Sequence, residues 1–121
     1  MWQYDNRMMD ILDKDEIEIR ECFPTVCPVC GKKEAHIYAH RFKEGEDRGG
    51  EWAWCSACHN CVHVSARLHK WWKNFDLIDF NKLSSIPDYL EDNKICIDAW
   101  INNLLFAEFT GKVRSKAEIF D

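Results

Sequence analysis

Residues 27–31 read Cys-Pro-Val-Cys-Gly, and residues 55–58 read Cys-Ser-Ala-Cys. In each stretch two cysteines are separated by two residues, a spacing that lets a tight turn direct both sulfur atoms at one metal ion. Zn²⁺ favours four such ligands in a tetrahedron, and four thiolates leave no coordination position open for chemistry. The sequence therefore predicts one structural zinc ion bound by Cys27, Cys30, Cys55 and Cys58.

A further cysteine, Cys61, follows the second pair at the same two-residue spacing and competes as a ligand. The residue one or two places after such a turn often has a positive φ angle, which glycine and asparagine tolerate better than a β-branched residue does. Gly31 occupies that place after the first pair, and residues 59–60, His-Asn, occupy it after Cys58, whereas Cys61 is followed by Val62. The pattern favours Cys58 as the fourth ligand. The alternatives are a site that uses Cys61 or a histidine as a ligand, a different metal such as iron, or no metal.

The segment between the two cysteine pairs and the residues after the second pair show the patterns of β-strands. Residues 36–42 alternate and are rich in strand-forming side chains, and residues 51–54 place two tryptophans on one face. A polar, glycine-containing turn at residues 43–50 separates them, and residues 61–68 form a third candidate strand. The sequence therefore predicts an α+β fold built on a small three-stranded antiparallel sheet with flanking helices.

Helical periodicity is confined to the two ends of the chain. Residues 4–14 place methionine, isoleucine and leucine near helical spacing, whereas residues 17–21 read as a short strand or an extended lead-in. Towards the C-terminus an apolar stripe predicts a helix packed on the sheet, and Thr110-Gly111 predicts its end. The stripe consists of Ile97, Trp100, Ile101, Leu104 and Leu105.

Together these elements predict a single domain over residues 1–121. Residues 1–21 are its helical or extended lead-in, residues 22–73 contain the metal site and the strands, and residues 74–121 form a helical C-terminal part. No run of about 18 apolar residues is present, so we expect neither a transmembrane helix nor a membrane partner. No secretory signal pattern is present, and the seven cysteines are an odd number. We therefore expect a cytoplasmic protein whose cysteines bind metal rather than form disulfides.

With its intervening strands, the CPVCG and WCSAC pattern over residues 22–68 resembles the zinc ribbon, a four-cysteine metal-binding module of many small proteins. The resemblance implies a zinc-ribbon sheet, although Cys-His-Asn stands where many ribbons have Cys-Gly. The run GGEWAWCSACHNCVHVSARLHKWWKN, residues 49–74, resembles small bacterial zinc-ribbon proteins, some of which belong to toxin–immunity systems. This second resemblance implies an immunity protein that neutralises a bacterial toxin.

Charge is distributed unevenly along the chain, whose net charge is −5. Residues 1–21 carry −4, residues 22–73 carry +3, and residues 74–121 carry −4. Four thiolates on one Zn²⁺ would add about −2 to the middle segment and bring it close to neutral. The balance favours a basic protein partner, such as a toxin domain, attracted by the acidic flanks. The alternative is a nucleic-acid-binding or transcription-associated zinc ribbon, which would use Arg41, Lys43, Arg48, Arg67, Lys70 and Lys73.

Four tryptophans in the middle of the chain allow two interpretations. Trp52, Trp54, Trp71 and Trp72 either fill the core of a thin sheet domain or form an exposed aromatic surface. In the second case they would anchor a partner together with Arg67, which carries a charge beside the aromatic rings. These five residues are therefore candidate partner-binding residues, with core packing as the simpler alternative.

The chain carries no pattern of an enzyme active site. It has no glycine-rich phosphate loop and no nucleophile elbow. A pair such as Cys61 with His63 would need a lowered thiol pKa and an orienting third group before it could act in catalysis, and the sequence marks neither. The sequence therefore predicts a non-enzymatic, zinc-stabilised protein-binding module.

Overall fold

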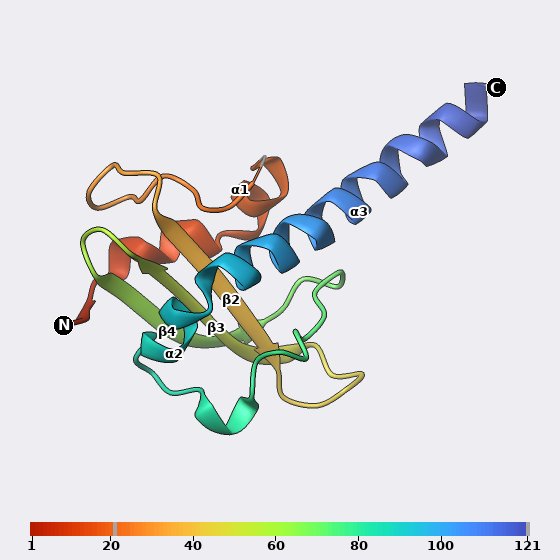
Figure 1. Ribbon diagram of the computed structural model, residues 1–121. Helices are drawn as coiled ribbons and strands as arrows, with labels where there is room; N and C mark the ends of the chain where they lie inside the picture. The colour runs from red at the N-terminus through yellow and green to blue at the C-terminus, as the bar shows by residue number, and fades with distance from the viewer. Residues whose placement is uncertain (21, 121) are drawn as a thin grey trace.

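The computed structural model describes residues 1–20 and 22–120, and the side chains of residues 1–18, 20 and 22–108. It is an α+β protein in which one four-stranded sheet lies between helical segments (Figure 1). In chain order the elements are β1 (Gln3–Tyr4), the 3-10 helix η1 (Asn6–Leu12), α1 (Lys14–Ile19), β2 (Ala35–Arg41), β3 (Arg48–Cys55), β4 (Asn60–Arg67), the 3-10 helix η2 (Phe80–Lys82), α2 (Asp88–Asp92) and α3 (Lys94–Phe120).

The three long strands lie where the sequence pattern predicts them. β2 pairs antiparallel with β3, with Tyr38 opposite Trp52, and β3 pairs antiparallel with β4, with Trp52 opposite His63. β3 begins at Arg48 and so extends into the predicted turn. The alternation of side chains therefore locates the centre of the sheet correctly and misses one strand end by a few residues.

The sheet is mixed rather than purely antiparallel, so the prediction of a three-stranded antiparallel sheet is wrong on this point. β1 adds to β4 in parallel and gives the strand order β1-β4-β3-β2. The N–H group of Gln3 donates to the carbonyl of His59 at 2.9 Å, and that of Asp5 donates to the carbonyl of Cys61 at 3.0 Å. A strand of two residues is too short to show an alternating pattern, so only the tertiary structure reveals it.

Two helix boundaries also differ from the expectations. Residues 17–21 were expected to be extended, but Lys14–Ile19 is helical. The Asp13 side chain accepts hydrogen bonds from the backbone N–H groups of the first turn, and Ile17 is buried. Residue 21 lies outside the described residues. Helix α3 continues to Phe120 and does not end at Gly111. A single glycine destabilises a helix by only about 1 kcal/mol relative to alanine, so it does not by itself end one.

The alternation along β3 separates the core into two layers. Trp52 and Trp54 lie on the face covered by α2, α3 and the segment before α2, where their indole N–H groups donate to the Ser84 carbonyl at 2.7 Å and the Glu91 carboxylate at 2.8 Å. Glu51 lies on the opposite face, which η1 covers. Helix α3 crosses β2 on the tryptophan face (Figure 1). Each layer thus joins one end of the chain to the central sheet.

Candidate metal centre

The structure brings together the four cysteines that the sequence predicts as metal ligands. Their Sγ atoms all lie within 4.8 Å of one another. Two contacts of 3.7 Å cross between the pairs, from Cys27 to Cys58 and from Cys30 to Cys55. A tetrahedral ion with metal–sulfur bonds of about 2.3 Å separates neighbouring sulfur atoms by about 3.8 Å. The cluster therefore has the size and the number of donors to hold one metal ion.

Both cysteine turns are built in the same way by local hydrogen bonds. In the first, the Gly31 N–H donates to the Cys27 carbonyl at 2.9 Å, and Gly31 has φ 78°. In the second, the His59 N–H donates to the Cys55 carbonyl at 3.0 Å, and His59 has φ 60°. A backbone N–H also donates to the first sulfur of each pair, at 3.3 Å from Val29 and 3.4 Å from Ala57. The prediction of a positive φ angle after each turn is confirmed.

The fourth member of the sulfur cluster is Cys58 rather than Cys61. Cys61 is buried within β4 and lies outside the sulfur cluster, which contains no histidine among the described residues. The preceding residue, Asn60, donates its side-chain N–H to the Cys58 sulfur at 3.2 Å. Once β4 begins at Asn60, the extended backbone carries Cys61 away from the turn and out of the cluster.

The acid–base properties of the thiols fit a site that needs a cation. Burial raises the pKa of Cys27 and raises that of Cys55 to about 12. At Cys58 burial acts in the same direction, but hydrogen bonds from the backbone and side chain of Asn60 outweigh it and lower the pKa. A nearby positive charge would favour deprotonation of the two buried thiols, Cys27 and Cys55, and a bound metal ion would supply that charge directly.

The N-terminal segment closes one side of the cluster, a role that the sequence does not signal. The Met8 side chain is fully buried in η1, and its Sδ atom lies 3.8 Å from the Cys27 sulfur. The Trp2 ring stacks on His59, the residue with φ 60°, at a centroid distance of 4.6 Å. Trp2 also donates from its indole nitrogen to the Asp88 carboxylate in α2. The first residues of the chain thus hold the second cysteine turn and link it to the helical part.

A buried polar network begins at Ser56, inside the second cysteine pair. The Ser56 hydroxyl lies 2.8 Å from His36 Nε2, and His36 Nδ1 lies 2.9 Å from both carboxylate oxygens of Asp98. This order of groups is the order of a serine–histidine–aspartate catalytic triad. Since sequence positions 36, 56 and 98 lie on β2, the cysteine turn and α3, no local pattern could have revealed the cluster.

The hydrogen-bond partners of Ser56 decide which proton each group carries. The Ser56 hydroxyl also lies 2.8 Å from the Glu91 carboxylate, and hydrogen bonds from Lys94, Ser56 and Trp54 outweigh burial and lower the Glu91 pKa. Because the carboxylate only accepts, Ser56 must donate to it, and His36 must then donate to Ser56. The Nε2 lone pair of His36 is therefore not free to activate Ser56.

Three of the four candidate partner-binding tryptophans lie inside the protein. Trp52, Trp54 and Trp72 are at most 4% exposed, and Trp71 is partly buried. Arg67 is 72% exposed and pairs with Asp47 at 3.6 Å. Core packing therefore accounts for the three buried rings, and of the five candidate residues only Trp71 and Arg67 present surface to a partner.

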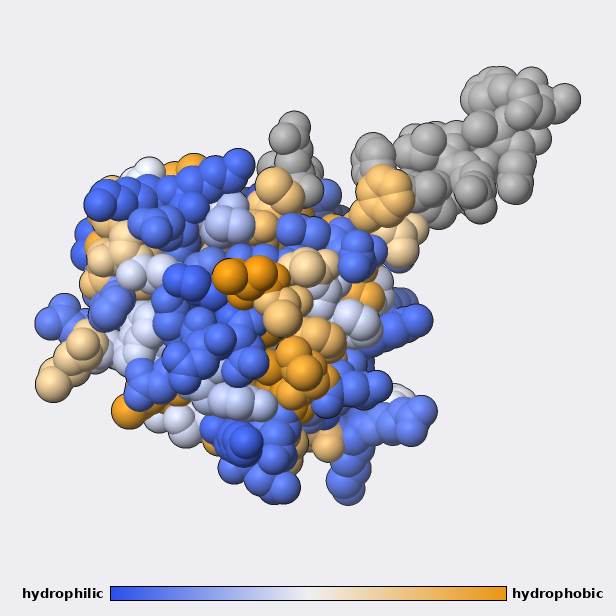
Figure 2. All heavy atoms as spheres, viewed as in Figure 1, coloured by the Kyte–Doolittle hydropathy of each residue, from blue (hydrophilic) through white to orange (hydrophobic). Residues whose placement is uncertain are grey.

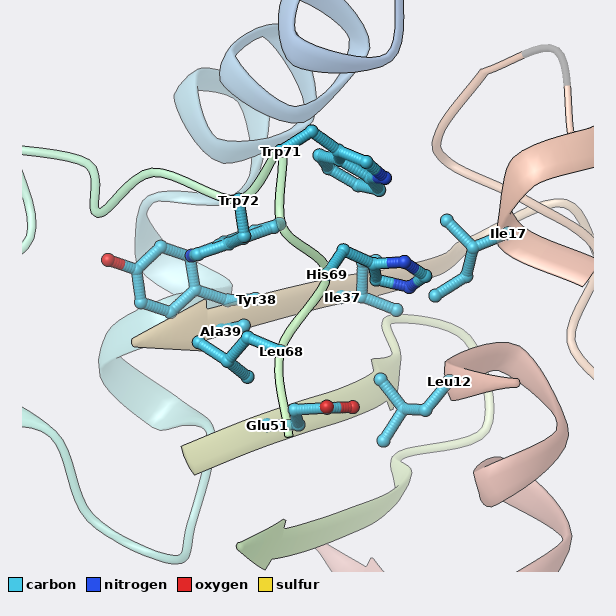
Figure 3. Close-up of a pocket in the computed structure, with 10 residues that line it drawn as sticks. All are labelled: Leu12, Ile17, Ile37, Tyr38, Ala39, Glu51, Leu68, His69, Trp71 and Trp72. Carbon is cyan, nitrogen blue, oxygen red and sulfur yellow. The ribbon is translucent and has the colours of Figure 1, made fainter. Parts of the chain in front are cut away.

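A single buried carboxylate, Glu51, lies on the face that η1 covers. Its residue exposure is 7%, and within the described part of the chain no hydrogen bond or ion pair reaches its carboxylate. Figure 3 shows the carboxylate directed toward Leu12, beside a cavity of about 10 Å³. Burial raises the pKa of Glu51 to about 7, a change that nearby Lys14 only partly offsets. Folding therefore favours the protonated form of this acid.

Stability is expected to depend on pH through Glu51. Its pKa rises from 4.5 to about 7 on folding, so its contribution is fully present below pH 4.5 and is lost as the pH rises through about 7. The total loss is roughly 3 kcal/mol. Between pH 6 and pH 8 the unfolding free energy of wild type should therefore fall by about 1 kcal/mol relative to that of the variant Glu51→Gln, which has no group that titrates there. Urea denaturation with saturating zinc measures both. Glu34→Gln, at an exposed site, is the control, and identical pH profiles for wild type and Glu51→Gln would contradict the prediction.

Comparison with models of known protein families, with curated proteins and with solved structures finds no match to this chain. Among the helices of the described residues, none is long and apolar enough to cross a membrane. What the chain can do is therefore argued from its own residues, and the four-cysteine cluster is the best-defined site among them.

Proposed function

We propose that this chain is a non-enzymatic binding module in which one zinc ion stabilises a zinc-ribbon sheet. The observation that carries the proposal is the cluster of four sulfur atoms, which is the donor set that Zn²⁺ prefers in structural sites. Four sulfur ligands complete the coordination shell, so the ion would stabilise the fold and leave no position for a substrate. The hydrogen bond between His36 Nε2 and Ser56 supports the same conclusion, because a nitrogen that donates to the hydroxyl cannot take its proton.

The ligand of the module, in this proposal, is a protein. Large apolar side chains in the C-terminal half are more than half exposed, and Figure 2 shows apolar surface gathered in the middle of one face among hydrophilic side chains. When a partner covers such surface, the free energy falls by roughly 25 cal/mol per Å² of apolar area buried. In residues 61–108 the large apolar side chains that are more than half exposed are Leu77, Phe80, Ile86, Ile95 and Phe106.

We further propose a basic toxin domain as the partner, which would make the chain an immunity protein. The acidic segments at both ends of the chain would attract such a domain and accelerate its association. Nucleic acid is a weaker candidate, because the guanidinium group of Arg41, one of the six basic side chains, already donates to the backbone carbonyls of His69 and Trp72.

Affinity capture of the tagged protein from lysate of its native cells, with and without nuclease, tests this function. We expect one stoichiometric protein partner that survives nuclease treatment, and a basic toxin domain would support immunity. Ile95→Lys, at a side chain 79% exposed, should weaken capture by removing apolar contact and adding like charge. Tyr4→Lys is the matched control, because Tyr4 is 65% exposed on β1 at the sheet edge opposite β2. Capture of nucleic acid alone, or of no partner, would contradict the proposal.

A further inference from the structure

A groove of about 370 Å³ lies between η1 and the strands β3 and β4. Met9 and Val64 contribute apolar wall, and the acidic residues Asp10, Asp13 and Glu51 also line it. Asp13 caps helix α1, where its side chain accepts hydrogen bonds from two backbone N–H groups. The groove therefore combines apolar walls with acidic groups, and the one buried carboxylate among them has no hydrogen bond or ion pair within the described residues.

That carboxylate belongs to Glu51, which is 7% exposed. It is directed toward Leu12, a residue that also lines the groove (Figure 3). Among the described residues no side chain or backbone group donates a hydrogen bond to it, and burial raises its pKa to about 7. The carboxylate is largely buried and lacks a donor within the described residues, so a cationic group that entered the groove would supply the charge-assisted hydrogen bonds that the chain does not provide.

The cations that the chain itself places at the groove do not fill this role. Lys14 lowers the pKa of Glu51 by its charge, but no ion pair forms between the two within 4.0 Å. Arg67 is 72% exposed and pairs with Asp47 at 3.6 Å. The missing cation is therefore expected from outside the chain, and its stem must suit apolar walls. Lysine and arginine side chains combine an apolar stem with a cationic head.

We propose that this groove receives a lysine or arginine side chain of the protein partner and that its cationic head pairs with Glu51. The inference rests on the proposed protein-binding function and adds to it a specific contact on the η1 face of the sheet. It also assigns a role to a charged residue that otherwise interrupts the apolar face of β3.

Side-chain analogues test the groove without the partner. Zinc-loaded full-length protein is titrated with n-butylguanidinium and n-butylammonium chloride while the backbone amide shifts of residues 12, 51 and 64 are followed by NMR. We expect saturable shifts with at least one of the two cations, at least about tenfold weaker binding to Glu51→Gln, and unchanged binding to Glu34→Gln. 1-Pentanol, a neutral compound with a similar stem, should not saturate. Equal binding of the cations to wild type and Glu51→Gln, or no saturation with either cation, would overturn the inference.

The captured partner separates this inference from the function on which it rests. If wild type captures a basic domain and Glu51→Gln captures it at least about tenfold more weakly, the contact is supported. If both proteins capture it equally, the groove assignment fails and the protein-binding function stands. If wild type captures no partner while the analogues still bind, the function fails and the cation site stands.

Discussion

Replacing Cys55 with serine is expected to unfold the protein at room temperature. Cys55 is fully buried at the end of β3, and its sulfur lies 3.7 Å from that of Cys30. A structural zinc ion contributes on the order of 10 kcal/mol of apparent folding free energy in small domains, and a whole domain is stable by only about 5–15 kcal/mol. Losing one ligand therefore removes most of the stability. Far-UV circular dichroism and thermal unfolding of Cys55→Ser, with and without added zinc, measure the effect.

Two matched controls make this result specific to the metal ligands. Cys96 is exposed on α3 and Cys61 is buried in β4, and neither belongs to the cluster. The unfolding free energy of Cys96→Ser should lie within about 0.5 kcal/mol of the wild-type value. That of Cys61→Ser should fall by only about 1–3 kcal/mol, the amount typical of placing a polar group at a buried position. Bound zinc, measured by release to a chromogenic chelator, should remain one ion per chain in both. Similar melting temperatures for Cys55→Ser and Cys96→Ser, or loss of zinc from Cys61→Ser, would contradict the ligand assignment.

The site could be predicted where its chemistry is written in short stretches of sequence. The spacing of the cysteines predicts the donor set, and the residues at positions 31 and 59–60 predict where the backbone turns left-handed, which the structure confirms with φ 78° at Gly31 and 60° at His59. The strands around Trp52 follow in the same way from alternation, since each strand is long enough to repeat the pattern.

What sequence could not predict depends on pairs of residues far apart in the chain. Strand β1 exists because Gln3 reaches the carbonyl of His59, and Met8 lies against Cys27 because η1 covers one face of the sheet. Neither contact has a periodic signal. Glu51 gave a weak signal, because it alternates with Trp52 and therefore lies on the opposite face of β3, where an acidic residue is unexpected. At this unexpected position the structure places a carboxylate without a partner among the described residues.

The second large effect is expected from breaking the buried contact between Asp98 and His36. Asp98 is 8% exposed, and both of its carboxylate oxygens lie 2.9 Å from His36 Nδ1, so Asp98→Asn would remove the acidic partner of a buried imidazole. Removing one member of a buried ion pair typically destabilises a protein by about 3–5 kcal/mol. We expect a loss of that size in urea denaturation at saturating zinc, whereas Asp92→Asn, at an exposed acid of α2, should change stability by less than about 0.5 kcal/mol.

The double variant tests whether His36 and Asp98 stabilise the fold as a pair. His36→Gln with Asp98→Asn removes both partners, so the two changes together should destabilise by less than the sum of the single variants, with a coupling energy of about 1–3 kcal/mol. Additive effects, with Asp98→Asn losing no more than Asp92→Asn, would show that this contact does not stabilise the fold. Exposure to a fluorophosphonate tests the neighbouring contact with Ser56 separately. A His36 Nε2 that donates to the Ser56 hydroxyl at 2.8 Å cannot take its proton, so we expect no labelling, whereas labelling of Ser56 would show that Nε2 carries the lone pair that activates a serine.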